Sequence, residues 1–176
     1  MSIDGYVGGP NGELDFMTWN WGDDIKKYVN DLTDSIDTIL LGRKMAGGFV
    51  AHWSGILNNP ADESYAFARK MMDTPKVVFT KTLEQTDWMN TVLAKGDITE
   101  EINNLKAQSG KDIIVYGGAS FDAALIKAGL IDELHLFINP TAIGKGLPIF
   151  LERTGLELID AKTFECGIVV LVYSLL

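Results

Sequence analysis

The sequence has few of the residues that build disulfides and metal sites. It contains one cysteine, Cys166, and two histidines, His52 and His135, among its 176 residues. One cysteine cannot form an intrachain disulfide, and this set is too small for the Cys/His groups that bind structural zinc. We therefore expect no metal, and a structural position for Cys166.

Long apolar runs and an excess of positive charge are also missing. The longest apolar stretch, residues 168–173, is far shorter than the roughly 18 residues of a membrane-spanning helix. The first residues show no signal-peptide pattern, so we expect a soluble, cytoplasmic protein. The net charge of −9, without any block of Lys or Arg, argues against nucleic acid as a partner. A small anion can still bind where basic side chains and helix N-termini meet.

The chain alternates short apolar runs with helical patterns. No repeat, linker or low-complexity tract interrupts it, so we expect a single domain over residues 1–176. The strand-like runs are residues 38–41, 76–80, 112–116, 134–138 and 168–175. Helical spacing of apolar residues is found in residues 23–35, 61–72, 99–108 and 119–128, and a further helix starts near Met45.

This order predicts an α/β fold with a mostly parallel central sheet and helices on both faces, because parallel neighbours need crossover connections. The first three strands are expected inside the sheet. Residues 140–162 join the last two strands without an obvious helix. We therefore expect those two strands to add an antiparallel edge at the C-terminus.

Glycine and basic residues follow the first three predicted strands. In an open α/β sheet, ligands bind beyond the carboxyl ends of the strands. The residues at these ends are Gly42, Arg43 and Lys44, then Thr80 and Lys81, then Gly117, Gly118, Ala119 and Ser120 at the start of a helix. Bare glycine backbone at a helix N-terminus suits a phosphate. The three segments together predict a phosphate-containing ligand, although a Gly-Gly pair alone is often only a turn, and G-x-G-x-x-G is absent.

Five motifs extend this prediction: MSIDGYVGGPNGELD, ILLGRKM, VVFTK, DIIVYGGASF and GLIDELHLFINPTAIGKGLPIF. In this order the sequence resembles the dihydrofolate-reductase-like family, and most closely the reductase domain of the bifunctional riboflavin-biosynthesis deaminase-reductase. The resemblance implies NADPH as cofactor. By position, residues 42–44 would meet its phosphates, residues 117–120 its pyrophosphate, and Thr80 and Lys81 its adenosine side with the ribose phosphate. Val7 and Gly8, after a turn at Asp4 and Gly5, would border the nicotinamide.

The resemblance also implies a pyrimidine- or pteridine-type substrate. Asp24 stands near the start of the first helix, where folate reductases have the acidic residue that holds the pterin ring, and it is the candidate catalytic residue. Asp4 and Trp19 would lie beside the substrate. Two alternatives remain: Asp24 favours the start of a helix, and Trp19 anchors a loop.

We therefore expect an NADPH-dependent reductase, with 5-amino-6-(5-phosphoribosylamino)uracil as one substrate to test. A dihydrofolate reductase or another small-molecule reductase is an alternative, and a non-catalytic nucleotide-binding homodimer belongs to another class. The resemblance implies a homodimer built with the last strands. Two features depart from the family: no zinc-deaminase motif is present, and the apolar strand that normally precedes M-S-x-D-G is missing from this sequence.

Overall fold

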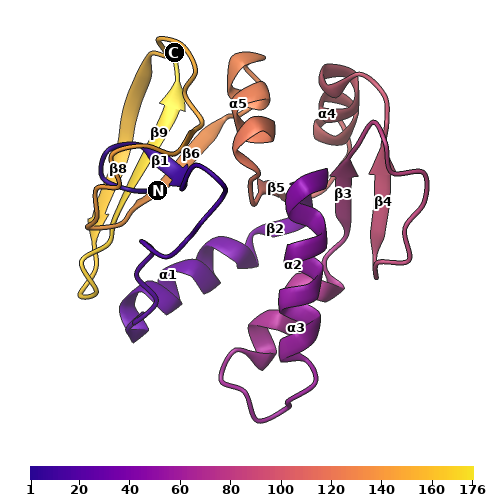
Figure 1. Cartoon of the computed structure of the whole chain (residues 1–176). Coiled ribbons are helices and arrows are strands. Elements are labelled where there is room, and N and C mark those ends of the chain that lie inside the picture. The colour runs from indigo at the N-terminus through magenta and orange to yellow at the C-terminus, as the bar shows by residue number, and fades with distance from the viewer. The chain divides into compact units, whose positions relative to one another are not determined.

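The computed structural model describes residues 1–176, and its strands form three sheets (Figure 1). The chain divides into two compact units. The central unit is Asn30–Phe121, and the terminal unit combines Met1–Val29 with Asp122–Leu176. Whether they act as one domain stays a prediction. None of the helices combines the length and the apolar character needed to span a membrane.

The central unit contains a parallel sheet of four strands in the order β4-β3-β2-β5. They are β2 (Ile36–Gly42), β3 (Lys76–Phe79), β4 (Thr91–Ala94) and β5 (Asp112–Val115). The predicted parallel sheet is confirmed, and β2 and β3 are interior strands as expected. The expectation for β5 is wrong, because this strand lies at an edge of the sheet. The other edge, β4, is a strand that the sequence patterns did not predict.

Helices cover both faces of this sheet, as predicted. On one face, α2 (Arg43–Ile56) and α3 (Tyr65–Asp73) pack apolar residues against β2 and β3, in a cluster that includes Ile39, Leu41, Phe49, Met71 and Val78. Phe79 follows Val78 in β3 and so points to the opposite face. There it packs against Phe121, at the start of α5 (Ala119–Lys127), with ring centroids 5.0 Å apart.

The helix α4 (Ile98–Lys106) begins after Asp97. The Asp97 side chain accepts hydrogen bonds from two of the first N–H groups of α4 and so caps this helix.

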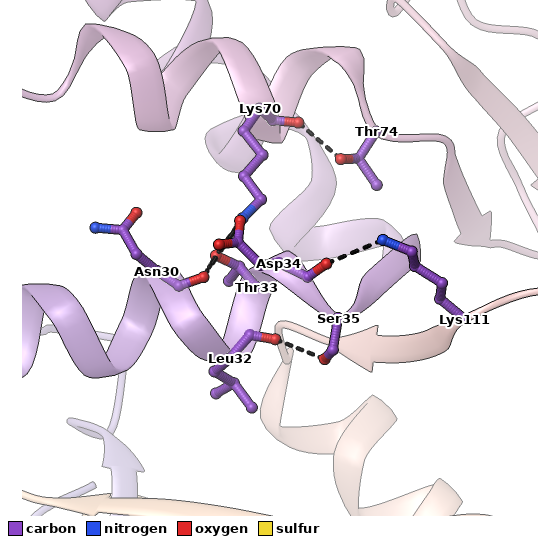
Figure 2. Close-up of polar contacts among 8 residues, drawn as sticks. All are labelled: Asn30, Leu32, Thr33, Asp34, Ser35, Lys70, Thr74 and Lys111. Carbon is purple, nitrogen blue, oxygen red and sulfur yellow. Dashed lines mark hydrogen bonds and ion pairs between the residues drawn. The ribbon is translucent and has the colours of Figure 1, made fainter.

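The C-terminal end of α1 (Asp23–Asp34) is held by lysines from elsewhere in the central unit (Figure 2). The last turn of α1 has no basic residue of its own. Lys70 of α3 forms an ion pair with Asp34 and donates to Thr33 Oγ1 at 2.9 Å, and Lys111 donates to the carbonyl of Asp34 at 3.2 Å. These cations supply the positive charge that the negative end of a helix dipole favours.

The terminal unit contains an antiparallel sheet in the order β6-β9-β8. Its strands are β6 (Glu133–Ile138), β8 (Leu156–Thr163) and β9 (Val169–Leu175), and a separate pair joins β1 (Tyr6–Gly8) to β7 (Leu147–Pro148). The predicted antiparallel pairing of β6 with β9 is confirmed. Residues 140–162 contain no helix, as expected, but they include β7 and most of β8, two strands that the sequence patterns did not predict. Residues 4–9 are not only a turn, since three of them form β1.

Candidate active site

Two helix N-termini meet at the carboxyl edge of the parallel sheet, within the central unit. Gly42 ends β2 and precedes α2, and Gly117 and Gly118 lie between β5 and α5. The N–H of Gly42 donates to the carbonyl of Gly117 at 3.5 Å. A Cβ added to Gly118 would lie 3.9 Å from the Cα of Gly42. The expectation that these segments share one edge is therefore confirmed.

Only glycine suits this arrangement. Gly117 and Gly118 have φ angles of +110° and +111°, which side-chain-bearing residues rarely adopt. A Cβ on Gly42 would come within 2.9 Å of the Cβ of Phe121, so α5 can approach β2 closely only because residue 42 has no side chain. The glycines bring the two helix starts together, and no side chain stands between them.

The start of α2 has the electrostatics of an anion site. No side chain caps its N-terminus at Gly42, and its first turn has no acidic residue. Arg43 and Lys44 instead occupy this turn, and both are exposed. Positive side chains at the positive end of a helix oppose its dipole, and the first N–H groups lack acceptors within the helix. An anion would relieve both conditions, so the local charge fits a phosphate group.

Thr80 and Lys81 stand after β3 at the same edge of the sheet. Thr80 is buried, and its Oγ1 accepts bonds from the N–H groups of Thr82 and Leu83 at 3.2 and 2.9 Å. Lys81 is exposed, and its Nζ donates to the carbonyls of Lys95 and Gly96 at 3.3 and 3.0 Å. These contacts hold the loop after β3 in place. A role for this pair in binding the ribose phosphate stays a prediction.

The strand β1 places Val7 and Gly8 in the terminal unit. Its partner is β7. A Cβ on Gly146, just before β7, would overlap the carbonyl oxygen of Gly8, so these two segments of backbone approach very closely. Asp4 stabilises this region, because its carboxylate accepts bonds from the N–H groups of Ile143 and Gly144 at 3.2 and 2.7 Å. The hydrogen bond from Ser2 and these backbone bonds lower the pKa of Asp4.

Asp24 and Trp19 also lie in the terminal unit. Asp24 is at the start of α1, and its two carboxylate oxygens accept bonds from the N–H groups of Ile25 and Glu165, at 2.8 and 2.9 Å. The contact with Ile25 fits the alternative in which Asp24 favours the helix start, and the contact with Glu165 joins that start to the segment between β8 and β9. The role of Asp24 at the substrate stays a prediction. Trp19 is 65% exposed and stacks on Trp21 with centroids 6.4 Å apart. Trp21, whose Nε1 donates to the carbonyl of Thr18, packs against the core and is the loop anchor.

One acidic residue was missed by the sequence patterns. Asp122 lies in the first turn of α5, and its Oδ1 is buried without a hydrogen-bond partner. Burial raises the pKa of Asp122 to about 7. The available signal was a single acid in the otherwise apolar run Phe121 to Ile126.

Comparison with known proteins gives the chain a family. A family model described as the RibD C-terminal domain matches residues 1–171. The chain is 34% identical to the uncharacterized protein YyaP of Bacillus subtilis (strain 168), over 98% of this chain and 90% of YyaP.

Solved structures share the fold at lower identity. One of them is a protein of Shewanella sp. PV-4 described as a riboflavin biosynthesis protein. It superposes with a TM-score of 0.73 at 20% identity, covering 100% of this chain and 95% of that one. RibD of Acinetobacter baumannii superposes with a TM-score of 0.68 at 15% identity, over 99% of this chain and 56% of RibD. The five motifs, the presence of a parallel sheet and an antiparallel C-terminal sheet, and the matching family model agree, and the chain belongs to the RibD C-terminal domain family.

Proposed function

We propose that this protein is an NADPH-dependent reductase that transfers hydride to a pyrimidine- or pteridine-type substrate. The observation that carries the proposal is the start of α2, where an uncapped N-terminus with Arg43 and Lys44 lies beside Gly118. Membership of the RibD C-terminal domain family supports the same reading. NADPH supplies the hydride, and the protein supplies binding, orientation and electrostatics.

Each part of the cofactor has proposed partners. The N–H groups at the starts of α2 and α5 (residues 42–44 and 117–120), with the side chains of Arg43 and Lys44, bind the phosphates. Thr80 and Lys81 bind the adenosine side, where Lys81 exchanges its two carbonyl partners for the ribose phosphate. Val7 and Gly8 border the nicotinamide.

For the substrate we propose Trp19 as a stacking surface, because a broad exposed ring suits a flat heterocycle. Asp4 and Asp24 keep further acceptor capacity on oxygens that already hold backbone N–H groups, so either can bind a substrate N–H without losing its structural bonds. One related structure, from Thermotoga maritima, is that of a deaminase/5-amino-6-(5-phosphoribosylamino)uracil reductase, which makes this compound the first substrate to test.

Titration with NADPH tests the proposal. Tryptophan emission should be quenched saturably below millimolar NADPH. The variant Arg43→Ala should bind about tenfold more weakly, since a hydrogen bond to a charged group contributes roughly 1.5–3 kcal/mol. Lys127→Ala, at an exposed lysine near the end of α5, is the matched control and should leave the affinity unchanged.

The outcomes separate the competing functions. Absence of saturable binding at millimolar NADPH would exclude every reductase version. Binding followed by NADPH oxidation with 5-amino-6-(5-phosphoribosylamino)uracil, or with dihydrofolate, identifies the substrate class. Binding without turnover of a panel of pyrimidines, pteridines and small carbonyl compounds favours the non-catalytic alternative.

We further propose a homodimer that uses the outer strand of the antiparallel sheet. Leu158 and Ile159 of β8 are 55% and 54% exposed, and the register of this strand is irregular between Leu158 and Asp160. Exposed apolar residues on an edge strand often mark a surface that contacts another protein chain. Leu158→Glu should convert the dimer into a monomer in analytical ultracentrifugation, whereas Leu151→Glu, outside the strand, should not. A wild-type monomer at micromolar concentration would refute the proposal.

A further inference from the structure

The Oδ1 atom of Asp122 is the one buried side-chain polar atom of the chain that has no hydrogen-bond partner, although the residue as a whole is only partly buried. Its neighbours Phe121 and Ala123 are buried apolar residues, as are Leu125 and Ile126 in the next turn of α5. An unpaired buried carboxyl group costs stability, and it costs most when it is ionised. The helix dipole favours an acid in the first turn of α5, but it favours the ionised carboxylate, which is the form that burial opposes here. A functional role would explain the acid.

The direction of the Asp122 side chain follows from the geometry of α5. Residues four apart lie on the same face of a helix, so Asp122 shares a face with Ile126. Ile126 belongs to an apolar cluster of the terminal unit that also contains Val7 of β1. Because helical side chains lean toward the N-terminus, the carboxyl group lies one turn beyond this cluster, toward the start of α5. It therefore lies on the side of α5 that joins this cluster, against which Val7 of β1 also packs. Val7 and Gly8 border the nicotinamide in the proposed function.

We propose that Asp122 is the acid that protonates the substrate during reduction, an inference that rests on the proposed reductase function. The substrate carbon accepts hydride from the reduced nicotinamide, and the electron pair of its C=N or C=O double bond moves to the nitrogen or oxygen. That atom takes the proton of the Asp122 carboxyl group, whose O–H bond breaks. The carboxylate then regains a proton from water. One hydride and one proton are transferred, which balances a two-electron reduction.

The environment of Asp122 prepares it for this step. Burial raises the pKa of its carboxyl group to about 7, and desolvation is the only cause, without a contribution from any charged neighbour. About half of the molecules then carry the proton at neutral pH. A pKa near the working pH is the condition under which a general acid is both loaded and able to give up its proton.

The test follows the Asp122 carboxyl group by NMR in protein labelled with ¹³C at aspartate carboxyl carbons, with Asp122→Asn to assign its signal. The pKa is measured in the free protein, with NADPH and with NADP⁺. Both nucleotides carry the same phosphates, but only NADP⁺ has a positively charged nicotinamide ring. A cation within about 6 Å should lower the pKa by about one pH unit or more relative to the NADPH complex. Equal pKa values in the two complexes would overturn the proposal.

The variant Asp122→Asn supplies a second readout. The amide keeps the shape of the side chain but has no acidic proton, so turnover should fall at least about 100-fold while NADPH affinity stays within twofold. Full turnover in this variant would also overturn the proposal. If the wild-type protein binds neither nucleotide, the proposed function itself fails, whatever the pKa of Asp122 in the free protein. The two failures are thus distinguishable.

Discussion

Replacing Lys76 by methionine should lower the free energy of unfolding by about 3 kcal/mol at pH 7, because the carbonyls of Met71 and Thr74 lose their donor and that of Met72 keeps only Asn90 Nδ2 at 3.3 Å. Lys76 is only 1% exposed, although it is a lysine at the first position of β3. Its Nζ donates to the carbonyls of Met71, Met72 and Thr74 at 3.1, 2.7 and 2.7 Å. Methionine matches the length and apolar stem of lysine but offers no donor to these oxygens.

The local sequence explains why this lysine is needed. The carbonyl of Met71 would normally accept the N–H of the residue four positions later, but that residue is Pro75, which has none. The N–H of Lys76, four positions after Met72, donates instead to Asn90. The end of α3 therefore presents carbonyls that the chain cannot satisfy by continuing the helix. The Lys76 ammonium binds them and also carries the positive charge favoured at a helix C-terminus.

The pH dependence of stability separates the gain from the Lys76 hydrogen bonds from the cost of burying the Lys76 charge. Burial lowers the pKa of Lys76 to about 8. A base with a lowered pKa in the folded state binds fewer protons there than when unfolded, so wild-type stability should rise between about pH 8 and 10.5. Lys76→Met should lack this rise, and its deficit should therefore grow with pH. A neutral amine still has two hydrogens to donate, enough for the carbonyls of Met71 and Thr74, and the carbonyl of Met72 also accepts from Asn90 Nδ2 at 3.3 Å.

Urea denaturation followed by circular dichroism measures the loss of stability at pH 7 and the change of this loss with pH. Lys127→Met, at an exposed lysine of α5, is the control and should change stability by less than about 0.5 kcal/mol. If Lys76→Met were as stable as the control, the three carbonyls must find other donors, and the structural role of Lys76 would be refuted.

Much of the fold follows from patterns that the sequence shows directly. Strand β2 contains the apolar run Ile39–Leu41, and α1 has one apolar stripe that includes Ile25, so both were predicted within one or two residues. The shared edge of Gly42 and Gly118 also followed, because parallel strands place their carboxyl ends together. These features depend on local periodicity and on a general rule of topology.

The features that were missed depend on contacts between distant segments. Strand β8 is exposed over most of its length, and its apolar alternation breaks where Leu158 and Ile159 stand side by side, so the strand is recognised only by its pairing with β9. Lys76 looks like an ordinary surface lysine until the carbonyls around it are known. Asp122 looks like an acid that favours the start of α5, and only its burial shows that the carboxyl group has no partner. Contacts of this kind have no signature in a single sequence.

Replacing Gly118 by valine should abolish detectable NADPH binding, a loss of at least about 100-fold. The φ angle of Gly118 is +111°, which a β-branched residue essentially never adopts, so the backbone there must rearrange. The rearrangement would redirect the N–H groups at the start of α5, and the new side chain would stand beside Gly42, where the phosphates are proposed to lie. Gly48→Val is the matched control, because Gly48 lies in α2 with open space around its Cβ position and no positive φ.

Isothermal titration of both variants with NADPH, together with urea denaturation, distinguishes a binding role from a purely structural turn. The strain in Gly118→Val should cost about 1–3 kcal/mol, which leaves a protein of ordinary stability folded. Folded Gly118→Val without NADPH affinity, beside an unchanged Gly48→Val, is the expected result. A purely structural turn would instead lose stability while each folded molecule kept its affinity for NADPH. That outcome would remove the start of α5 from the cofactor site and leave the uncapped start of α2, with Arg43 and Lys44, as its remaining phosphate-binding element.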